Sequence, residues 1–98
     1  MPLTLRPLAM KFEWDPRKAV DNVKKHGIAF AEAATCFSDE HAVYLEELGH
    51  RERLVLIAYS TGKRLLFTVF AEIHRDVIRI VSARKVTPRE RRRYEEGE

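Results

Sequence analysis

The sequence predicts an α+β fold in which an antiparallel sheet carries two N-terminal helices on one face and is followed by a C-terminal helix. Apolar residues recur at helical spacing between residues 19 and 37, which predicts the two N-terminal helices. Three runs rich in Val, Ile and Leu follow between residues 53 and 83, and their short links are typical of antiparallel strands. A threonine–proline pair then opens a basic segment at residue 87, as expected at a helix start. The predicted element order is β-α-α-β-β-β-α.

Length and composition restrict the class of protein. The chain has 98 residues, 45% of them hydrophobic, and a formal net charge of +3. This length accommodates one domain with a modest core. A single cysteine excludes an internal disulfide, and the longest apolar stretches are too short for a transmembrane helix. We therefore expect a small, reduced, cytoplasmic domain that has no membrane partner.

The start of the chain differs from the rest. Residues 1–9 have no periodic pattern and do not resemble a secretory signal. A patterned segment begins directly after Met10. We therefore expect residues 1–9 to be a flexible leader or an incorrectly assigned start, and residues 10–98 to form the single domain.

A short strand and a first helix are expected at the start of this domain. Residues 11–14 alternate between polar and apolar side chains, as in a strand. Asp15 and Pro16 suit the N-cap and first turn of a helix, and Gly27 suits its left-handed C-terminal position. The side chains that we expect this helix to bury are Ala19, Val20 and Val23.

The second helix is indicated by apolar side chains at helical spacing, namely Phe30, Ala33, Ala34 and Phe37. Ala29 occupies its cap position and has no side-chain acceptor, so we expect a weak helix start. Residues 38–41 end this helix.

Strands are expected over residues 53–59, 64–71 and 77–83, and the sequence allows a shorter one over residues 42–48. The last helix begins where an N-cap, a first-turn proline and a capping-box acid follow one another. These residues are Thr87, Pro88 and Glu90.

Charge is unevenly distributed along the chain. Acids predominate between residues 32 and 52, where Arg51 is the only arginine or lysine. Bases predominate between residues 75 and 94, namely Arg75, Arg79, Arg84, Lys85, Arg89, Arg91, Arg92 and Arg93. Such segregation favours the binding of a polyanion, although a solvated arginine-rich helix gives the same pattern.

We expect no metal and no cofactor. The four histidines and Cys36 do not have zinc-site spacing, and the four glycines are too scattered to form a phosphate-binding loop. Cys36 lies on the apolar side of the second predicted helix, which favours a buried structural thiol over a nucleophile.

Arg79 stands inside a predicted strand. Strand periodicity places it on one face with Val77, Val81 and Ala83. A buried charge in a central strand is costly, so we expect this face to open onto solvent or a groove.

The same periodicity places Arg64, Thr68 and Glu72 together, and we expect them to share a phosphate-binding sheet face with Arg79. A structural ion pair between Arg79 and Glu72 is the alternative. Aromatic side chains on which a base could stack are Phe12, Trp14, Tyr59 and Tyr94.

A second basic cluster, Lys24, Lys25 and His26, ends the first predicted helix. Histidine exchanges protons near neutral pH, so His26 beside two lysines could bind a phosphate or act as a general acid or base. The alternative is a structural cap on the last carbonyl groups of the helix.

Together these motifs resemble the BrnT family of type II toxins, which are ribonucleases of the RelE-like fold. The matching segments, in order, are residues 12–15, 22–27, 30–33, 78–85 and 87–91, with Tyr94. The resemblance covers residues 11–96. Two positions depart from the family pattern, namely Ala29 in place of a frequent capping serine and residues 49–52 in place of a more acidic turn.

The resemblance implies a metal-independent endoribonuclease that inhibits translation, with cleavage by attack of the RNA 2′-hydroxyl. The implied catalytic residues are Lys25, His26, Arg64, Arg79 and Arg84. The implied RNA-binding residues are Lys24, Glu72, Lys85 and Tyr94.

The resemblance also implies two partners besides RNA. A BrnA-like antitoxin would neutralise the toxin in a heteromeric complex, and this complex would repress its own promoter by binding operator DNA through the antitoxin. The alternative from another class is a non-catalytic basic module that binds nucleic acid or protein, and a degenerate toxin would have the same sequence features.

Overall fold

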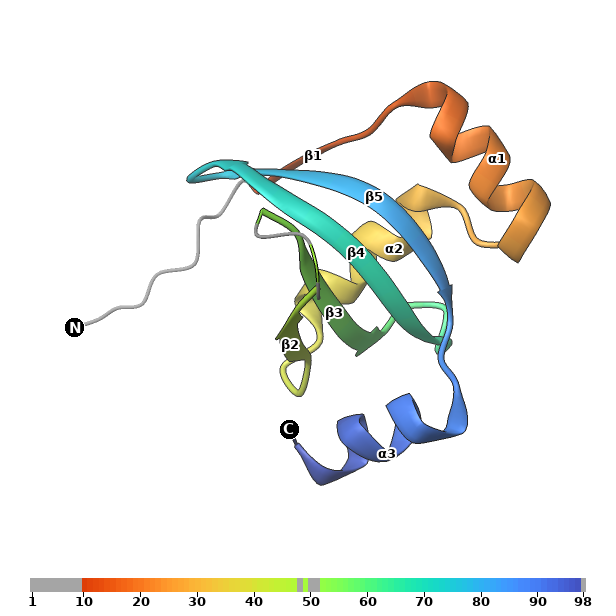
Figure 1. The fold of residues 1–98 in the computed structure, drawn as a ribbon, viewed down its shortest axis with the longest axis vertical. Coiled ribbons are helices and arrows are strands. Elements are labelled where there is room, and N and C mark those ends of the chain that lie inside the picture. The colour runs from red at the N-terminus through yellow and green to blue at the C-terminus, as the bar shows by residue number, and fades with distance from the viewer. Residues whose placement is uncertain (1–9, 48, 50–51, 98) are drawn as a thin grey trace.

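A computed structural model describes residues 10–47, 49 and 52–97 (Figure 1). Its elements are β1 (Lys11–Glu13), α1 (Pro16–His26), α2 (Phe30–Thr35), the 3-10 helix η1 (Cys36–Ser38), β2 (Val43–Glu46), β3 (Leu54–Tyr59), β4 (Leu65–His74), β5 (Val77–Lys85) and α3 (Pro88–Glu96). The α+β class is confirmed, and β2 is the shorter strand that the sequence allowed. The expected leader, residues 1–9, lies outside the described residues.

The five strands form one sheet in the order β1-β5-β4-β3-β2. Strands β2 to β5 pair antiparallel, as predicted, but β1 pairs in parallel with β5 and places Phe12 opposite Ile78. The prediction of an antiparallel sheet is therefore wrong for this edge strand. Since β1 has three residues and two helices follow it, no local turn sets its direction.

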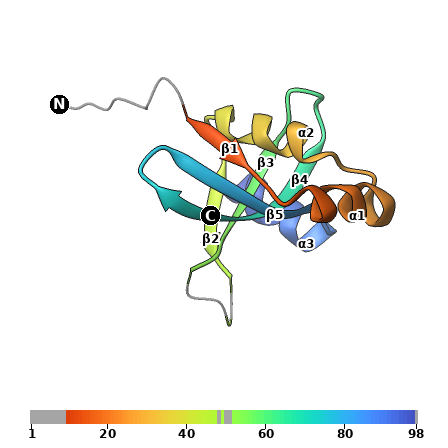
Figure 2. The same cartoon turned by 90° about the horizontal axis from the view of Figure 1, so that it is seen from above.

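Helices lie on both faces of the sheet (Figure 2). α2 and η1 cover one face, and Phe30 of α2 packs with Phe70 of β4 in the larger core. α3 packs on the opposite face, where Tyr94 contacts the smaller core. α1 lies along β5 and contributes Ala19 to the larger core.

The inner face of α1 differs from the prediction. Val20 and Val23 are 55% and 48% exposed, whereas Asn22 is only 5% exposed. The expected burial of both valines is therefore wrong, and of the three predicted residues only Ala19 packs against the core. Helical geometry allows Asn22 to face the sheet, and a polar residue there gave no hydrophobic signal.

Asn22 is anchored by three hydrogen bonds. Its amide nitrogen donates to the carbonyl oxygens of Ile28 at 2.9 Å and Ala83 at 2.8 Å. Its carbonyl oxygen accepts from the backbone N–H of Ala83 at 3.1 Å. This one side chain thus satisfies buried backbone groups of β5 and of the segment between α1 and α2, and it fixes α1 against the sheet.

A register shift in β5 changes which side chains share a face. Ser82 pairs with Val69 and Ile80 with Phe70, so Val81 is an extra residue on β5. Ala83 consequently joins Ile80 in the larger core, whereas Val81 packs on the smaller one. The prediction that Arg79 and Ala83 share a face is therefore wrong.

The predicted helix caps are present. The Asp15 carboxylate accepts hydrogen bonds from first-turn N–H groups of α1, and Gly27 ends this helix with φ of 71°. Ala29 makes no side-chain cap, as expected. Thr87 and Glu90 form the predicted capping box of α3.

Cys36 is a structural thiol, as predicted. It is fully buried and donates a weak hydrogen bond to the carbonyl oxygen of Ala58 at 3.5 Å. Burial raises the pKa of this thiol to about 12, so it is protonated at neutral pH and is a poor nucleophile.

We predict that Asn22→Ala destabilises the fold by about 3 kcal/mol, because it leaves three buried backbone groups without their partner. Val20→Ala, two residues earlier on the exposed side of the same helix, should change stability by less than about 0.5 kcal/mol. Denaturant unfolding followed by circular dichroism measures both values. Equal effects of the two substitutions would contradict the anchoring role of Asn22.

Candidate active site

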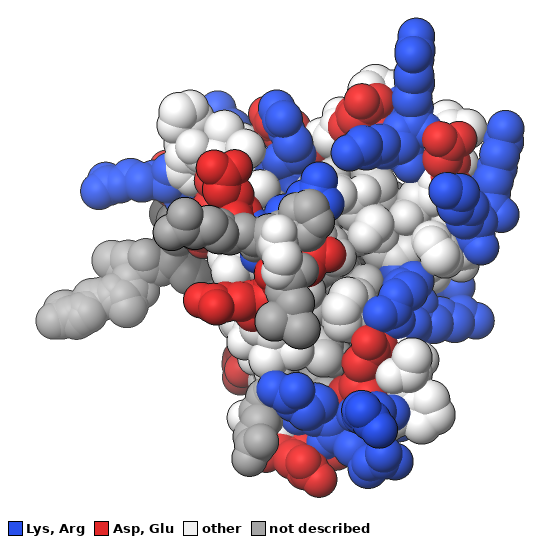
Figure 3. All heavy atoms as spheres, in the orientation of Figure 1, with Lys and Arg blue, Asp and Glu red and all other residues white. Residues whose placement is uncertain are grey.

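Basic side chains surround a hollow between the β3–β4 turn, the end of β5 and α3. Its volume is about 450 Å³, and we call it the basic hollow. It is lined by Tyr59, Lys63, Arg64, Leu65, Lys85, Val86 and Arg91. Figure 3 shows lysine and arginine side chains gathered over α1 and α3 on this side of the molecule.

The basic hollow contains no carboxylate among its lining residues. Leu65 and Val86 supply apolar surface, and Lys63, Arg64, Lys85 and Arg91 supply positive charge. Three other hollows each have at least one acid in their walls. The first contains Glu40, Glu95 and Glu96, the second Glu13 and Asp15, and the third Glu52. Among these four hollows, the basic hollow therefore has the wall that best suits an anion.

Arg64 is held in place by Glu32 of α2. Its Nε donates to Glu32 Oε2 at 2.9 Å, and its Nη2 donates to Glu32 Oε1. Ser60 Oγ also donates to Glu32 Oε2, at 2.7 Å. The hydrogen bonds from Arg64 lower the pKa of Glu32 to about 2, so this carboxylate stays ionised and orients the guanidinium.

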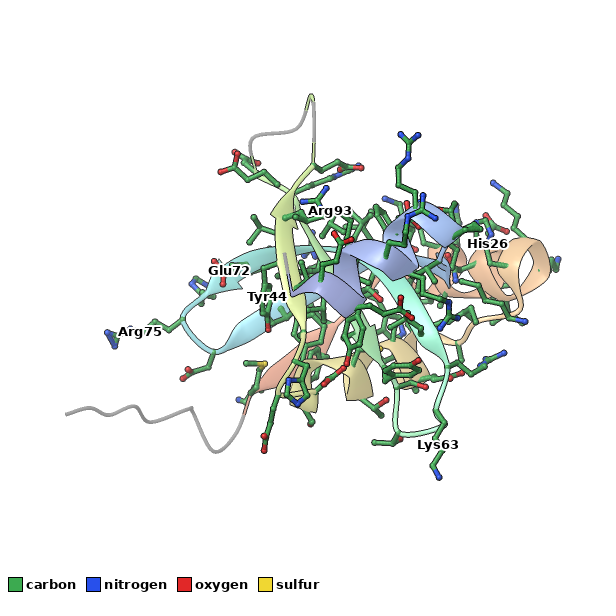
Figure 4. All side chains as sticks on the ribbon, turned by 90° about the horizontal axis from the view of Figure 1, so that it is seen from below. His26, Tyr44, Lys63, Glu72, Arg75 and Arg93 are labelled. Carbon is green, nitrogen blue, oxygen red and sulfur yellow. The ribbon has the colours of Figure 1, made fainter. Side chains whose placement is uncertain are left out.

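The C-terminal end of α1 lies next to this arginine. Arg64 Nη2 donates to the carbonyl oxygen of Gly27 at 3.4 Å, and Gly27 directly follows the predicted cluster of Lys24, Lys25 and His26, although none of these three residues lines the basic hollow. His26 is exposed (Figure 4) and makes no hydrogen bond with the described residues. Its predicted alternative role as a helix cap is therefore not observed, and its imidazole is available to a ligand.

Arg84 joins β5 to α3. Its two terminal nitrogens each donate to a Glu90 carboxylate oxygen at 2.9 Å, and its guanidinium lies 4.0 Å from the centre of the Phe67 ring. Burial acts to raise the pKa of Glu90, but hydrogen bonds from Arg84 and Thr87 outweigh it and lower this pKa. Arg84 thus fixes the start of α3 beside the basic hollow.

Two tyrosines hold the other end of α3 on the sheet. The Tyr94 hydroxyl donates to Asp39 Oδ2 at 2.7 Å, and this oxygen also accepts from the Tyr59 backbone N–H at 2.9 Å. The two rings meet edge to face, 5.3 Å between centroids. Burial and Asp39 raise the pKa of Tyr94 to about 12, which makes it a packing residue and a poor proton donor.

Arg79 lies away from the basic hollow. Its Nε and Nη2 contact Glu13 Oε2 at 2.7 and 2.6 Å, so its ion-pair partner is Glu13 and the predicted alternative partner Glu72 is wrong. Arg79 lines a different hollow with Lys18 and Asp15.

The predicted phosphate-binding sheet face does not form. Thr68 is fully buried, and the Arg64 guanidinium binds Glu32 of α2. Glu72 lies near the β4–β5 hairpin with Arg75, on the opposite side of the molecule from His26 (Figure 4). Alternation alone could not show that helices cover both faces or that β5 contains a register shift.

The structure adds Lys63 and Arg91 to the residues that sequence reasoning found, and it selects Tyr59 among the aromatics. Arg91 Nη1 donates to the Tyr59 hydroxyl at 3.3 Å. Lys63 has a left-handed backbone with φ of 66°, which is uncommon for lysine. By contrast, Phe12 and Trp14 pack against Phe37 and Phe30.

Comparison with known proteins identifies the class. Residues 14–90 match the model of a family described as "Ribonuclease toxin, BrnT, of type II toxin-antitoxin system". A solved structure, the Brucella abortus ribonuclease toxin BrnT, matches with 25% identity over 81% of this chain and 99% of that chain, with a TM-score of 0.66. A search of curated proteins gives no match.

The class is therefore that of the ribonuclease toxins of type II toxin–antitoxin systems. Within this class the chain belongs to the BrnT family, as its sequence motifs predicted.

The Glu32–Arg64 pair predicts a specific pH dependence. Because the pKa of Glu32 is lowered from 4.5 to about 2, the pair stabilises the fold fully above pH 4.5, and this contribution is lost as the pH falls toward 2. Glu32→Gln should therefore be less stable than the wild type at neutral pH, and the difference should shrink over this range. Urea unfolding at several pH values measures it, and a pH-independent difference would contradict the role of the pair.

Proposed function

We propose that this protein is the toxin of a type II toxin–antitoxin pair, an endoribonuclease that cleaves RNA at the basic hollow and thereby inhibits translation. The observation that carries the proposal is the meeting of four cationic side chains, free of acidic neighbours in the hollow wall, with the exposed end of α1. Membership of the BrnT family supports ribonuclease activity.

The proposed chemistry is attack of the RNA 2′-hydroxyl on the adjacent phosphorus. The P–O bond to the 5′ oxygen breaks, and the products are a 2′,3′-cyclic phosphate and a 5′-hydroxyl. Negative charge builds up on the phosphoryl oxygens, and Arg64 with Lys85 stabilises it from the hollow. Glu32 keeps the guanidinium of Arg64 oriented, so less ordering is needed when the RNA binds.

Two proton transfers accompany this attack, and His26 is the proposed proton-transfer residue. It lies at the end of α1 next to Gly27, which Arg64 contacts. Lys25 and Lys24 precede it and are placed to bind neighbouring phosphates. In this proposal the positive charge that stabilises the transition state comes from the side chains named above.

The other predicted site residues take different roles in this proposal. Arg84 and Tyr94 position α3, through Glu90 and Asp39 respectively. Arg79 and Glu72 lie outside the basic hollow and take no part in the proposed chemistry.

The proposed partner is a BrnA-like antitoxin that neutralises the toxin in a heteromeric complex. We further propose that this complex acts in the cytoplasm and represses its own promoter, with operator DNA bound through the antitoxin. Support comes from family membership, since type II systems pair a toxin with an antitoxin protein. Among the described residues no helix is long and apolar enough to cross a membrane.

Arg64→Ala is predicted to lower the rate of RNA cleavage about 100-fold or more and to abolish growth arrest on expression, because it removes charge stabilisation at the phosphate. Arg75→Ala is the matched control, since Arg75 lies at the far β4–β5 hairpin (Figure 4). Thermal unfolding checks that both variants fold. Wild-type cleavage by a folded Arg64→Ala variant would refute the assignment.

His26→Ala is predicted to lower the cleavage rate by about 10²–10⁴-fold, the usual contribution of a general acid or base. His74→Ala, another exposed histidine, should cleave at the wild-type rate. Gel analysis of end-labelled RNA measures both. Full activity of His26→Ala would remove the histidine from the mechanism, and salt-dependent binding without products in the wild type would favour the non-catalytic alternative.

A further inference from the structure

We propose that the basic hollow recognises single-stranded RNA by stacking one unpaired base on the ring of Tyr59, while Arg64 and Lys85 hold the adjoining phosphate. The inference rests on the proposed function and goes beyond it, because it names the form of RNA and a base-binding residue. It is carried by the contacts of Tyr59 and by the chemistry of the walls around it.

The Tyr59 ring is fixed in place before any ligand binds. It is 39% exposed, and the Tyr94 ring packs against it at an angle of 83°. Arg91 donates a hydrogen bond to its hydroxyl, and Asp39 accepts one from its backbone N–H. Stacking on such a ring loses little conformational freedom.

The walls of the basic hollow match the two parts of a nucleotide. Leu65 and Val86 line the hollow together with Tyr59, and their apolar surface suits the faces of a base. Lys63, Arg64 and Lys85 line the same hollow, and their positive charge suits the phosphate. One small cavity therefore offers both kinds of contact within the reach of one nucleotide.

Tyr44 shows why exposure alone is insufficient. It is 55% exposed, more than Tyr59, but its hollow also contains Glu40, Glu95 and Glu96. These carboxylates repel an RNA backbone. Among the described tyrosines, Tyr59 is thus the exposed one whose hollow is lined by cationic residues and by no acid.

The basic hollow is large enough for one unstacked base. About 450 Å³ lies within the range of small-ligand pockets and can receive a base that has left its stack. Bases inside a duplex are covered on both faces, and a duplex is contacted mainly through its backbone and minor groove. Stacking on Tyr59 therefore requires an unpaired nucleotide.

Lys63 adds a cation to the basic hollow from the β3–β4 turn. Its φ of 66° is a conformation that glycine or asparagine adopts more easily, yet a lysine occupies it (Figure 4). This places a flexible cation at the rim of the same hollow.

The test measures binding of a short single-stranded 2′-O-methyl oligonucleotide, which lacks the attacking hydroxyl and stays intact, by fluorescence anisotropy. Tyr59→Leu should weaken binding about tenfold, the effect of losing one base–aromatic stack. The slope of log Kd against log salt should not change, because no phosphate contact is lost. Tyr59→Phe, which keeps the ring, and Tyr44→Leu, the matched control, should bind like the wild type.

A change in the oligonucleotide tests the same stack without altering the protein. One abasic position should weaken binding to the wild type but add nothing to the defect of Tyr59→Leu, as expected if both remove one contact. A duplex of the same sequence should bind less tightly and be insensitive to Tyr59→Leu. Thermal unfolding checks that each variant folds.

Unchanged single-strand binding by folded Tyr59→Leu, a changed salt slope, or a duplex that binds as tightly as the single strand would overturn the inference. Cleavage of unmodified RNA by the wild type separates the two proposals. If the wild type cleaves and Tyr59→Leu binds normally, only the stacking inference fails. If the wild type forms no product, the proposed ribonuclease function fails.

Discussion

The arrangement of this protein depends on the hydrogen bonds between Asn22 and the backbone of β5. They connect α1 to Ala83 and also bind the carbonyl oxygen of Ile28, which leads into α2. Because Asn22 is the buried residue of α1, this polar anchor sets the position of the C-terminal end of the helix against the sheet. The helix end, with His26 and Gly27, is thereby placed beside Arg64, and the candidate site follows from that contact.

Acidic side chains pair with three of the arginines and offset part of their charge. Glu13, Glu32 and Glu90 pair with Arg79, Arg64 and Arg84 respectively, so a count of positive charge along the sequence overstates what is available. The net charge of +3 is small. Charge nevertheless concentrates where the β3–β4 turn, β5 and α3 meet without an acid in the hollow wall. Local geometry, and not net charge, provides the attraction for phosphate.

Features set by local chemistry could be predicted from the sequence, including the helix caps, the main strands and the burial of Cys36. Features set by distant contacts could not. The sequence pattern predicted Val20 and Val23 as core residues, but Asn22 faces β5 instead and both valines are exposed. Arg79 does not share a face with Ala83, because Val81 is an extra residue in β5. The sequence motifs identified the BrnT family and suggested site residues on α1, β4, β5 and α3, with Arg64 directly before β4. The basic hollow itself joins a turn to a helix far along the chain, which periodicity cannot reveal.

The most direct test of the account is the chemistry of the RNA ends. Purified wild-type protein is incubated with a defined single-stranded RNA, and the products are analysed by mass spectrometry. Attack by the 2′-hydroxyl, with positive charge from Arg64 and Lys85 and proton transfer by His26, predicts 2′,3′-cyclic phosphate and 5′-hydroxyl ends. Products with 3′-hydroxyl and 5′-phosphate ends would contradict the mechanism and the role of the basic hollow in it.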